Sequence, residues 1–221
     1  MWIKICANTS LEDAQLAAAL GADALGFVFA PSKRRVTAEQ VARITPHLPA
    51  AVERVGVFHS LDADEITTTV RAAGLNAVQL HGGVDPALAR RLREIFGGEI
   101  KIIQTIHWAA DADGSNASAI VEQLDGIARE GIADRVLIDS KVGTAIGGTG
   151  VIFDWEKARA TLAQHAGDLK LIVAGGLRAE NVAEAITRLA PWGVDVASGV
   201  EAEPGRKDPE KLAAFIKSSR S

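Results

Sequence analysis

The chain has 221 residues, 48% of them hydrophobic, and a formal net charge of −4, which is enough apolar material for one large domain or two small ones. The acidic balance and the aromatic content of 5% argue against a nucleic-acid-binding protein. The N-terminus has no long apolar segment, and no stretch reaches about 18 uncharged apolar residues. We therefore expect neither secretion nor membrane spanning, and the single cysteine suits a reducing, cytoplasmic location.

Short apolar segments alternate with stretches of helical periodicity along the chain. Apolar runs of this length, bounded by Gly, Pro, Asp or Ser, are typical of buried strands. We predict strands at residues 2–7, 22–29, 52–58, 77–81, 99–106, 135–139, 171–174 and 194–197. The intervening stretches, among them 118–131 and 179–189, are expected to be helices.

Polar residues with capping ability precede most of these helical stretches. The expected N-caps are Ser10, Thr37, Ser60, Asp85, Asp154 and Asp208. Asp13 follows Ser10, and Gln40 follows Thr37, at the three-residue spacing of a capping box. Pro46 is expected to end the second helix.

The strand–helix unit is repeated eight times. Alternating units of this kind form a parallel sheet with helices outside it, and eight of them close a (β/α)8 barrel of the TIM class. We therefore predict that residues 1–221 form a single domain with this fold. A doubly wound open sheet is the alternative, although it rarely needs eight regular repeats. Active sites of such barrels lie at the C-terminal ends of the strands.

The last two predicted strands each end in a small, glycine-bearing turn, Gly175-Gly176 and Ser198-Gly199. Glycines at a strand end allow backbone N–H groups to face an anion, and the loops after strands 7 and 8 of such barrels frequently form a phosphate site. A single turn of this kind would indicate only a tight structural turn and not a phosphate site. Two in succession at the end of the repeat predict that they hold a substrate phosphate.

Titratable side chains lie at the ends of several predicted strands: Lys4, Cys6, His81, Asp139 and Asp195. Taken singly, such residues are more often a buried thiol, a structural histidine or a helix cap. Because barrel closure puts the eighth strand beside the first, Asp195 is expected to pair with Lys4 below Cys6. A charged Lys4 would favour the Cys6 thiolate.

The loop after the second strand contains Lys33, Arg34 and Arg35, which are either a solvated basic turn or a site for a substrate carboxylate. A phosphate at strands 7 and 8 would place this second anion site across the barrel mouth. The five histidines show no metal-binding spacing, and there is no P-loop and no dinucleotide fingerprint. We therefore expect neither a metal nor a cofactor.

Seven segments together resemble the phosphoribosylanthranilate isomerase family of tryptophan biosynthesis. In chain order they are KICANTSLEDA, GADALGFVFAPSKRRV, RVGVF, NAVQLHG, LIDS with GGTGVIFDW, VAGGLRAENV and GVDVASGVEAEPGRKD. Each is weak alone, but the set covers nearly the whole chain, from Lys4 to Asp208. One difference stands out, because the family has glycine where this chain has Ala7. A Cβ there would be unfavourable if the position requires a positive φ.

The resemblance implies a cofactor-free Amadori rearrangement of phosphoribosylanthranilate. It implies that Cys6 is the general base at ribose C2′, that Asp139 is the general acid at the ring oxygen, and that Arg34 binds the anthranilate carboxylate. The two glycine-bearing turns match the phosphate site, and Asp195 matches a polar residue near the sugar. Lys4 and His81 are further substrate-site candidates.

The expected partner is this phosphosugar alone, with no nucleic acid and no membrane, for a cytoplasmic monomer or homodimer. Two alternatives remain. Related phosphosugar isomerases, including bifunctional ones, use two aspartates, one of them on the first strand, where this chain has Cys6. A catalytically silent phosphosugar-binding protein would need neither Cys6 nor Asp139.

Overall fold

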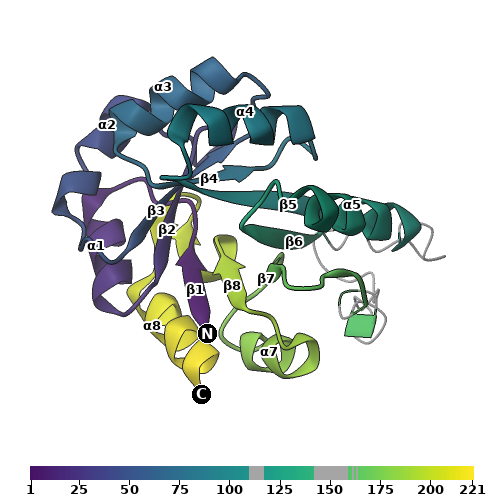
Figure 1. Ribbon diagram of the computed structural model, residues 1–221. Coiled ribbons are helices and arrows are strands. Elements are labelled where there is room, and N and C mark those ends of the chain that lie inside the picture. The colour runs from purple at the N-terminus through teal and green to yellow at the C-terminus, as the bar shows by residue number, and fades with distance from the viewer. Residues whose placement is uncertain (110–116, 142–158, 161, 163) are drawn as a thin grey trace.

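The computed structural model describes residues 1–109, 117–141, 159–160, 162 and 164–221. Within these ranges, parallel strands form a closed barrel in chain order from β1 to β8, with the last strand paired to the first (Figure 1). The strands are β1 (Trp2–Ile5), β2 (Ala24–Val28), β3 (Glu53–Phe58), β4 (Ala77–Leu80), β5 (Lys101–Ala109), β6 (Arg135–Lys141), β7 (Lys170–Ala174) and β8 (Gly193–Val196). The prediction of a (β/α)8 barrel is confirmed, and the open doubly wound sheet is excluded.

Helices surround the barrel (Figure 1). They are α1 (Leu11–Ala19), α2 (Ala38–Ala42), α3 (Ala63–Ala73), α4 (Pro86–Phe96), α5 (Ala117–Glu130), α7 (Val182–Leu189) and α8 (Pro209–Arg220). Asp154, the predicted cap of the sixth helix, and the glycine-rich loop at 143–150 lie outside the described residues, whereas residues 159–160, 162 and 164–165 of the predicted helix are helical. No helix in the described part of the chain is long and apolar enough to cross a membrane.

The helix caps follow the sequence with two exceptions. Thr37 and Gln40 form both hydrogen bonds of a capping box. At α1 only half of the box exists: Ser10 accepts from the Asp13 N–H, but the Asp13 carboxylate accepts instead from the backbone N–H of Lys207, almost two hundred residues away. A distant backbone donor thus replaces the local one.

Asp62, and not Ser60, is the N-cap of α3. Its Oδ1 accepts hydrogen bonds from the N–H groups of Asp64 and Glu65, while Ser60 Oγ donates to the Glu65 carboxylate. The carboxylate two residues nearer the helix satisfies both free N–H groups. The second helix also ends earlier than expected, at Ala42, before Pro46 enters a separate 3₁₀-helix at Thr45–His47.

A short antiparallel hairpin between β8 and α8 was not predicted. It consists of β9 (Glu201–Glu203) and β10 (Arg206–Lys207). It follows the 3₁₀-helix η2 (Ser198–Val200) directly. The hairpin matters for the site because Glu201 and Lys207 are both buried in it.

Apolar side chains fill two separate layers. The larger layer lies between the barrel and the helices, and the smaller one fills the lower barrel interior with Trp2, Val55, Ile103, Leu137 and Ile172 among others. Lys4, above this inner layer on β1, has no exposed surface. The lower barrel is thus a packed core that supports the strand ends where the predicted site residues lie.

Candidate active site

A cavity of about 500 Å³ opens at the C-terminal ends of the barrel strands. The predicted site residues lining it are Cys6, Arg34, His81, Asp139, Gly175, Gly176, Asp195, Ser198 and Gly199. Lys4 is the exception, since it is buried and does not line the cavity. The fold therefore gathers residues from both ends of the chain around one space.

Lys4 and Asp195 form the ion pair expected from barrel closure. They are register partners on β1 and β8, and the distance from Lys4 Nζ to Asp195 Oδ1 is 3.0 Å. Burial opposes the charge of Lys4, but Asp195 and Cys6 outweigh it, so the pKa of Lys4 is raised. Lys4 therefore remains a cation inside the barrel.

The Cys6 thiol lies directly above this pair and is almost completely buried. Burial raises the pKa of Cys6 and Asp195 adds to the rise, whereas Lys4 and Lys207 lower it. Lys4 thus acts in the expected direction, but burial outweighs it, and the net pKa of Cys6 is raised. In the free protein the thiol form of Cys6 is favoured at neutral pH.

Gly26, in the middle of β2, makes room for the thiol. A Cβ at this position would lie 2.8 Å from Cys6 Sγ and 3.0 Å from Lys4 Cε. Both distances are too short for a stable contact, so only glycine fits here without displacing a site residue. The sequence contained a signal for this, because an isolated glycine inside a strand often marks a close approach.

Ala7, directly after the thiol, has a φ of 62° and is buried. This left-handed conformation is unfavourable for a residue with a Cβ. The next side chain holds the turn in place: Asn8 Nδ2 donates to the carbonyl oxygens of Ile5 at 2.7 Å and Gly26 at 3.2 Å. The position where the resemblance implies glycine therefore has the positive φ that glycine favours.

Arg34 is held by a protein carboxylate. Its Nε and Nη2 donate to both oxygens of Glu201 at 2.6–3.0 Å, and its Nη1 makes no hydrogen bond within the described residues. Burial raises the pKa of Glu201, but Arg34 and Lys207 outweigh it, so this pKa is lowered and Glu201 is ionised. Glu201 thus fixes the guanidinium through Nε and Nη2, and Nη1 is available to bind a ligand.

Lys207 connects this ion pair to the thiol. Its Nζ lies 3.5 Å from Glu201 Oε1 and donates to the backbone oxygen of Cys6 at 2.5 Å. The Lys207 side chain has no exposed surface, and burial lowers its pKa. The hairpin therefore links the position of Arg34 to the position of Cys6.

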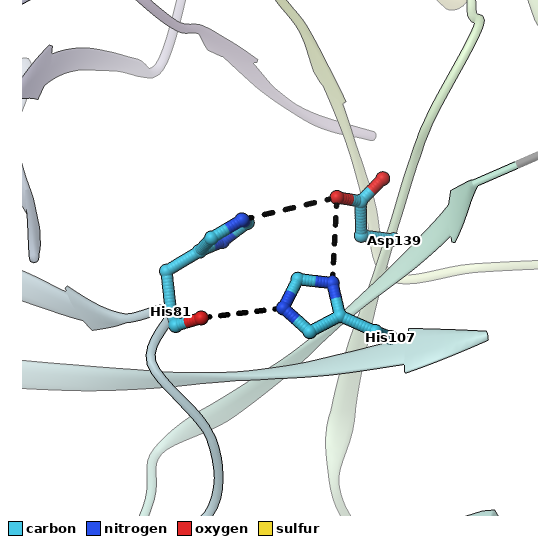
Figure 2. A group of neighbouring side chains, drawn as sticks. All are labelled: His81, His107 and Asp139. Atoms are coloured by element: carbon cyan, nitrogen blue, oxygen red, sulfur yellow. Dashed lines mark hydrogen bonds and ion pairs between the residues drawn. The ribbon is translucent and has the colours of Figure 1, made fainter. Parts of the chain in front are cut away.

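Asp139, at the end of β6, lies beside two histidines (Figure 2). Its Oδ2 is 3.9 Å from His81 Nε2 and 3.7 Å from His107 Nδ1. The expectation that the histidines are scattered is wrong for this pair, because β4, β5 and β6 are neighbours and His107 is the register partner of Asp139. Sequence spacing could not show this, since His81 directly follows β4 while His107 and Asp139 lie on two other strands.

The two glycine-bearing turns meet on one side of the cavity. Gly175 and Gly176 have φ values of 95° and 64°. A Cβ at Gly199 would lie only 1.9 Å from the Leu177 carbonyl oxygen. Glycine is thus required at both turns, for conformation in the first and for close approach in the second.

Comparison with known proteins agrees with this arrangement. The family model for N-(5'-phosphoribosyl)anthranilate (PRA) isomerase matches residues 3–218. The isomerase of that name from Rubrobacter xylanophilus is 40% identical over 220 residues, which cover 99% of this chain and 98% of that protein. This chain belongs to the N-(5'-phosphoribosyl)anthranilate isomerase family.

Solved structures of this isomerase family have the same fold. Monomers generated from the dimeric enzyme of Thermotoga maritima superimpose with a TM-score of 0.79 at 34% identity, covering 100% of this chain and 98% of that one. A phosphoribosylanthranilate isomerase in complex with reduced 1-(o-carboxyphenylamino)-1-deoxyribulose 5-phosphate gives a TM-score of 0.78 at 35% identity, with the same coverage.

Four residues at the site of this family member were not predicted from its sequence: Gly26, His107, Glu201 and Lys207. Only Gly26 has a local signal. The other three reach the site through strand neighbours or through the unpredicted hairpin.

Proposed function

We propose that this chain catalyses the rearrangement of N-(5'-phosphoribosyl)anthranilate to 1-(o-carboxyphenylamino)-1-deoxyribulose 5-phosphate in tryptophan biosynthesis. The observation that carries the proposal is a buried thiol, Cys6, and a carboxyl group, Asp139, lining one cavity in a chain of this family. A base and an acid at one sugar ring are what an aldose–ketose rearrangement requires, because only protons move.

The reaction divides into two proton transfers. Protonated Asp139 gives its proton to the furanose ring oxygen, and the C1′–O bond breaks as the anthranilate nitrogen forms a Schiff base with C1′. Cys6 thiolate then removes the proton from C2′, and the resulting enolamine tautomerises to the ketose. Atoms balance without a redox partner. General acid–base groups of this kind contribute roughly 10²–10⁴-fold each.

The two ends of the substrate suit the two sides of the cavity. The turns at Gly175-Gly176 and Ser198-Gly199 would bind the phosphate through backbone N–H groups. Arg34 would bind the anthranilate carboxylate through Nη1, since Glu201 already occupies Nε and Nη2. Glu201 therefore acts as the positioning residue for Arg34.

Three further residues have supporting roles in this proposal. Asp195 lines the cavity close to Cys6 and would contact the sugar, while Lys4 neutralises Asp195 from below at 3.0 Å. His81 lies 3.9 Å from Asp139 and would orient the acid toward the ring oxygen. We also propose that residues 1–221 act as one cytoplasmic domain, as a monomer or, like the dimeric relative, as a homodimer.

The test is turnover of freshly generated phosphoribosylanthranilate, followed by the loss of its anthranilate fluorescence. Wild type should turn over, and Cys6→Ala and Asp139→Asn should each lower kcat by roughly 10²–10⁴-fold. Exposed His47, which lies in the 3₁₀-helix after α2 and does not line the cavity, gives the matched control His47→Gln, which should retain the wild-type rate. A folded wild type that binds the reduced product analogue without turnover would instead be a silent binding protein.

A further inference from the structure

His81, His107 and Asp139 form a compact group at the ends of three neighbouring strands, here called the His–His–Asp cluster (Figure 2). One ligand atom from each residue lies within 4.8 Å of the other two. All three residues are partly buried. The cluster therefore brings two imidazole nitrogens and a carboxylate oxygen to one point at the cavity wall.

The hydrogen bond of His107 determines which of its nitrogens is free to bind. Nε2 lies 3.2 Å from the backbone oxygen of His81, and because a carbonyl oxygen only accepts, Nε2 must carry the hydrogen. Nδ1 of the neutral ring then presents a lone pair toward Asp139 Oδ2. Metal-binding histidines almost always donate their other ring N–H to a carbonyl or carboxylate in this way.

The burial of His107 Nδ1 is a second observation that points to a ligand, independent of the hydrogen bond made by Nε2. His107 Nδ1 is buried, and among the described residues it makes no hydrogen bond. A buried acceptor without a donor is unfavourable, and here it faces another acceptor at 3.7 Å. A positively charged species between them would give His107 Nδ1 the partner it lacks among the described residues.

The imidazole ring of His81 is also held in position, through contacts of its Nδ1. Its Nδ1 lies 3.3 Å from Thr105 Oγ1 and 3.4 Å from Gln79 Nε2. Nε2 points toward Asp139 (Figure 2), and it presents a lone pair there in the tautomer whose Nδ1 carries the hydrogen and donates to Thr105 Oγ1. Ring orientation is therefore set before any ligand arrives, as in a preorganised site.

The distances fit a metal ion better than a shared hydrogen bond. At 3.7 and 3.9 Å the nitrogen–oxygen separations exceed hydrogen-bonding range. Bonds of about 2.0–2.1 Å to a tetrahedral zinc ion place two ligand atoms about 3.3 Å apart, so both nitrogen–oxygen pairs need to close by only about 0.4–0.6 Å. The two imidazole nitrogens, which lie within 4.8 Å of each other, would close around the ion by a side-chain rotation. Two imidazoles and a carboxylate suit Zn²⁺ or Co²⁺, whereas Mg²⁺ and Ca²⁺ prefer oxygen ligands alone.

We propose that the His–His–Asp cluster binds one divalent transition-metal ion of the Zn²⁺ class, with the cavity side open to water as a further ligand. An Asp139 carboxylate bound to the ion cannot carry the proton that ring opening needs, so the bound ion inhibits the isomerase. The inhibition rests on the proposed function, but the binding of the ion does not.

The binding test uses metal-stripped protein titrated with Co²⁺, read by its visible d–d absorption, and with Zn²⁺, read by calorimetry. Wild type should bind one equivalent, and His107→Gln should weaken binding by at least about tenfold. His47→Gln serves as the matched control and should bind like wild type. His81→Gln is a second ligand variant in case His107→Gln does not give the wild-type circular dichroism spectrum.

Two results would overturn the binding: no cobalt absorption in wild type, or wild-type affinity in both ligand variants, which would mean that the ion binds at adventitious sites elsewhere. Inhibition is a separate measurement, in which Zn²⁺ should lower wild-type turnover reversibly with EDTA and should affect His107→Gln less, each relative to its own metal-free rate. Binding without inhibition would refute the inhibitory role alone. If the chain does not turn over phosphoribosylanthranilate at all, the titrations still decide the binding.

Discussion

Glu201, in the hairpin, forms ion pairs with both Lys207 and Arg34, and Glu201→Gln tests what these pairs stabilise. The side chain of Glu201 is 4% exposed, that of Lys207 is 0% exposed and that of Arg34 is 27% exposed. Removing one partner of a buried pair costs about 3–5 kcal/mol. Since Arg34 can turn toward water, we expect the lower end, about 3 kcal/mol of unfolding free energy. For a chain of this size that corresponds to a Tm lower by roughly 6–12 °C.

The same substitution should affect substrate binding more than chemistry. Three hydrogen bonds of 2.6–3.0 Å keep the Arg34 fork in place, and without the charge the fork is free to rotate. We expect KM to rise by about tenfold or more, since charged hydrogen bonds contribute about 1.5–3 kcal/mol each, with a smaller change in kcat. Glu203→Gln, an exposed carboxylate on the same hairpin, is the matched control.

The pH dependence gives a second reading of Glu201→Gln. Burial raises the pKa of Glu201, but Arg34 outweighs it and the folded-state pKa is lowered. A lowered carboxylate pKa stabilises the fold above the unfolded value of about 4.3, and this stability is lost as the pH falls through the folded pKa. The stability difference between wild type and Glu201→Gln should therefore shrink below about pH 4. A loss under about 1 kcal/mol at pH 7 together with an unchanged KM would refute this reasoning.

Three other substitutions test the rest of the site. Lys4→Met removes a group that lowers the pKa of Cys6, so alkylation of the thiol should require higher pH, and an unchanged apparent pKa would rule out the tuning role. Ala7→Gly relieves a left-handed backbone conformation that costs about 1–2 kcal/mol, but it removes a buried methyl group worth about 0.8 kcal/mol and adds about 0.5–1 kcal/mol of backbone entropy to the unfolded chain. Urea denaturation should therefore show a free energy of unfolding within about 1 kcal/mol of wild type. A decrease of more than about 2 kcal/mol would contradict the inference that Ala7 is strained. Gly199→Ala places a Cβ 1.9 Å from a carbonyl of the neighbouring turn, so inhibition by inorganic phosphate should weaken, unlike in Gly126→Ala, where a Cβ meets nothing within 4 Å.

Local patterns predicted the elements of this fold because each element carries its own signal. Strand segments were found within a few residues, and Thr37, Asp85 and Asp208 cap the helices as expected. Barrel closure then predicted the Lys4–Asp195 pair across almost the whole chain. That inference needed only the topology, because strand order and alternation decide which residues face each other.

Residues with no pattern of their own could not be predicted. The hairpin that carries Glu201 and Lys207 has strands of three and two residues, too short for an alternation to be recognised. Its charges reach partners 167 and 201 positions away, Arg34 and Cys6. His107 likewise joins the site only because β5 lies between β4 and β6.

The pKa of Cys6 shows a different limit, since the sequence named Lys4 as a group that favours the thiolate but could not give the net direction of the pKa shift. Lys4 lowers the pKa as expected, yet burial of the thiol raises it more, and Asp195 opposes Lys4. The net direction is the difference of large opposing effects, each of which depends on depth and distance that sequence does not contain. Only the thiolate form of Cys6 can act as the base, and the raised pKa leaves little of it at neutral pH. The rate of the proposed reaction should therefore increase as the pH rises through neutrality, until Cys6 is fully ionised. In the proposed mechanism Asp139 must be protonated in the same complex that ionises Cys6, so the cavity would have to raise the pKa of Asp139 and lower that of Cys6.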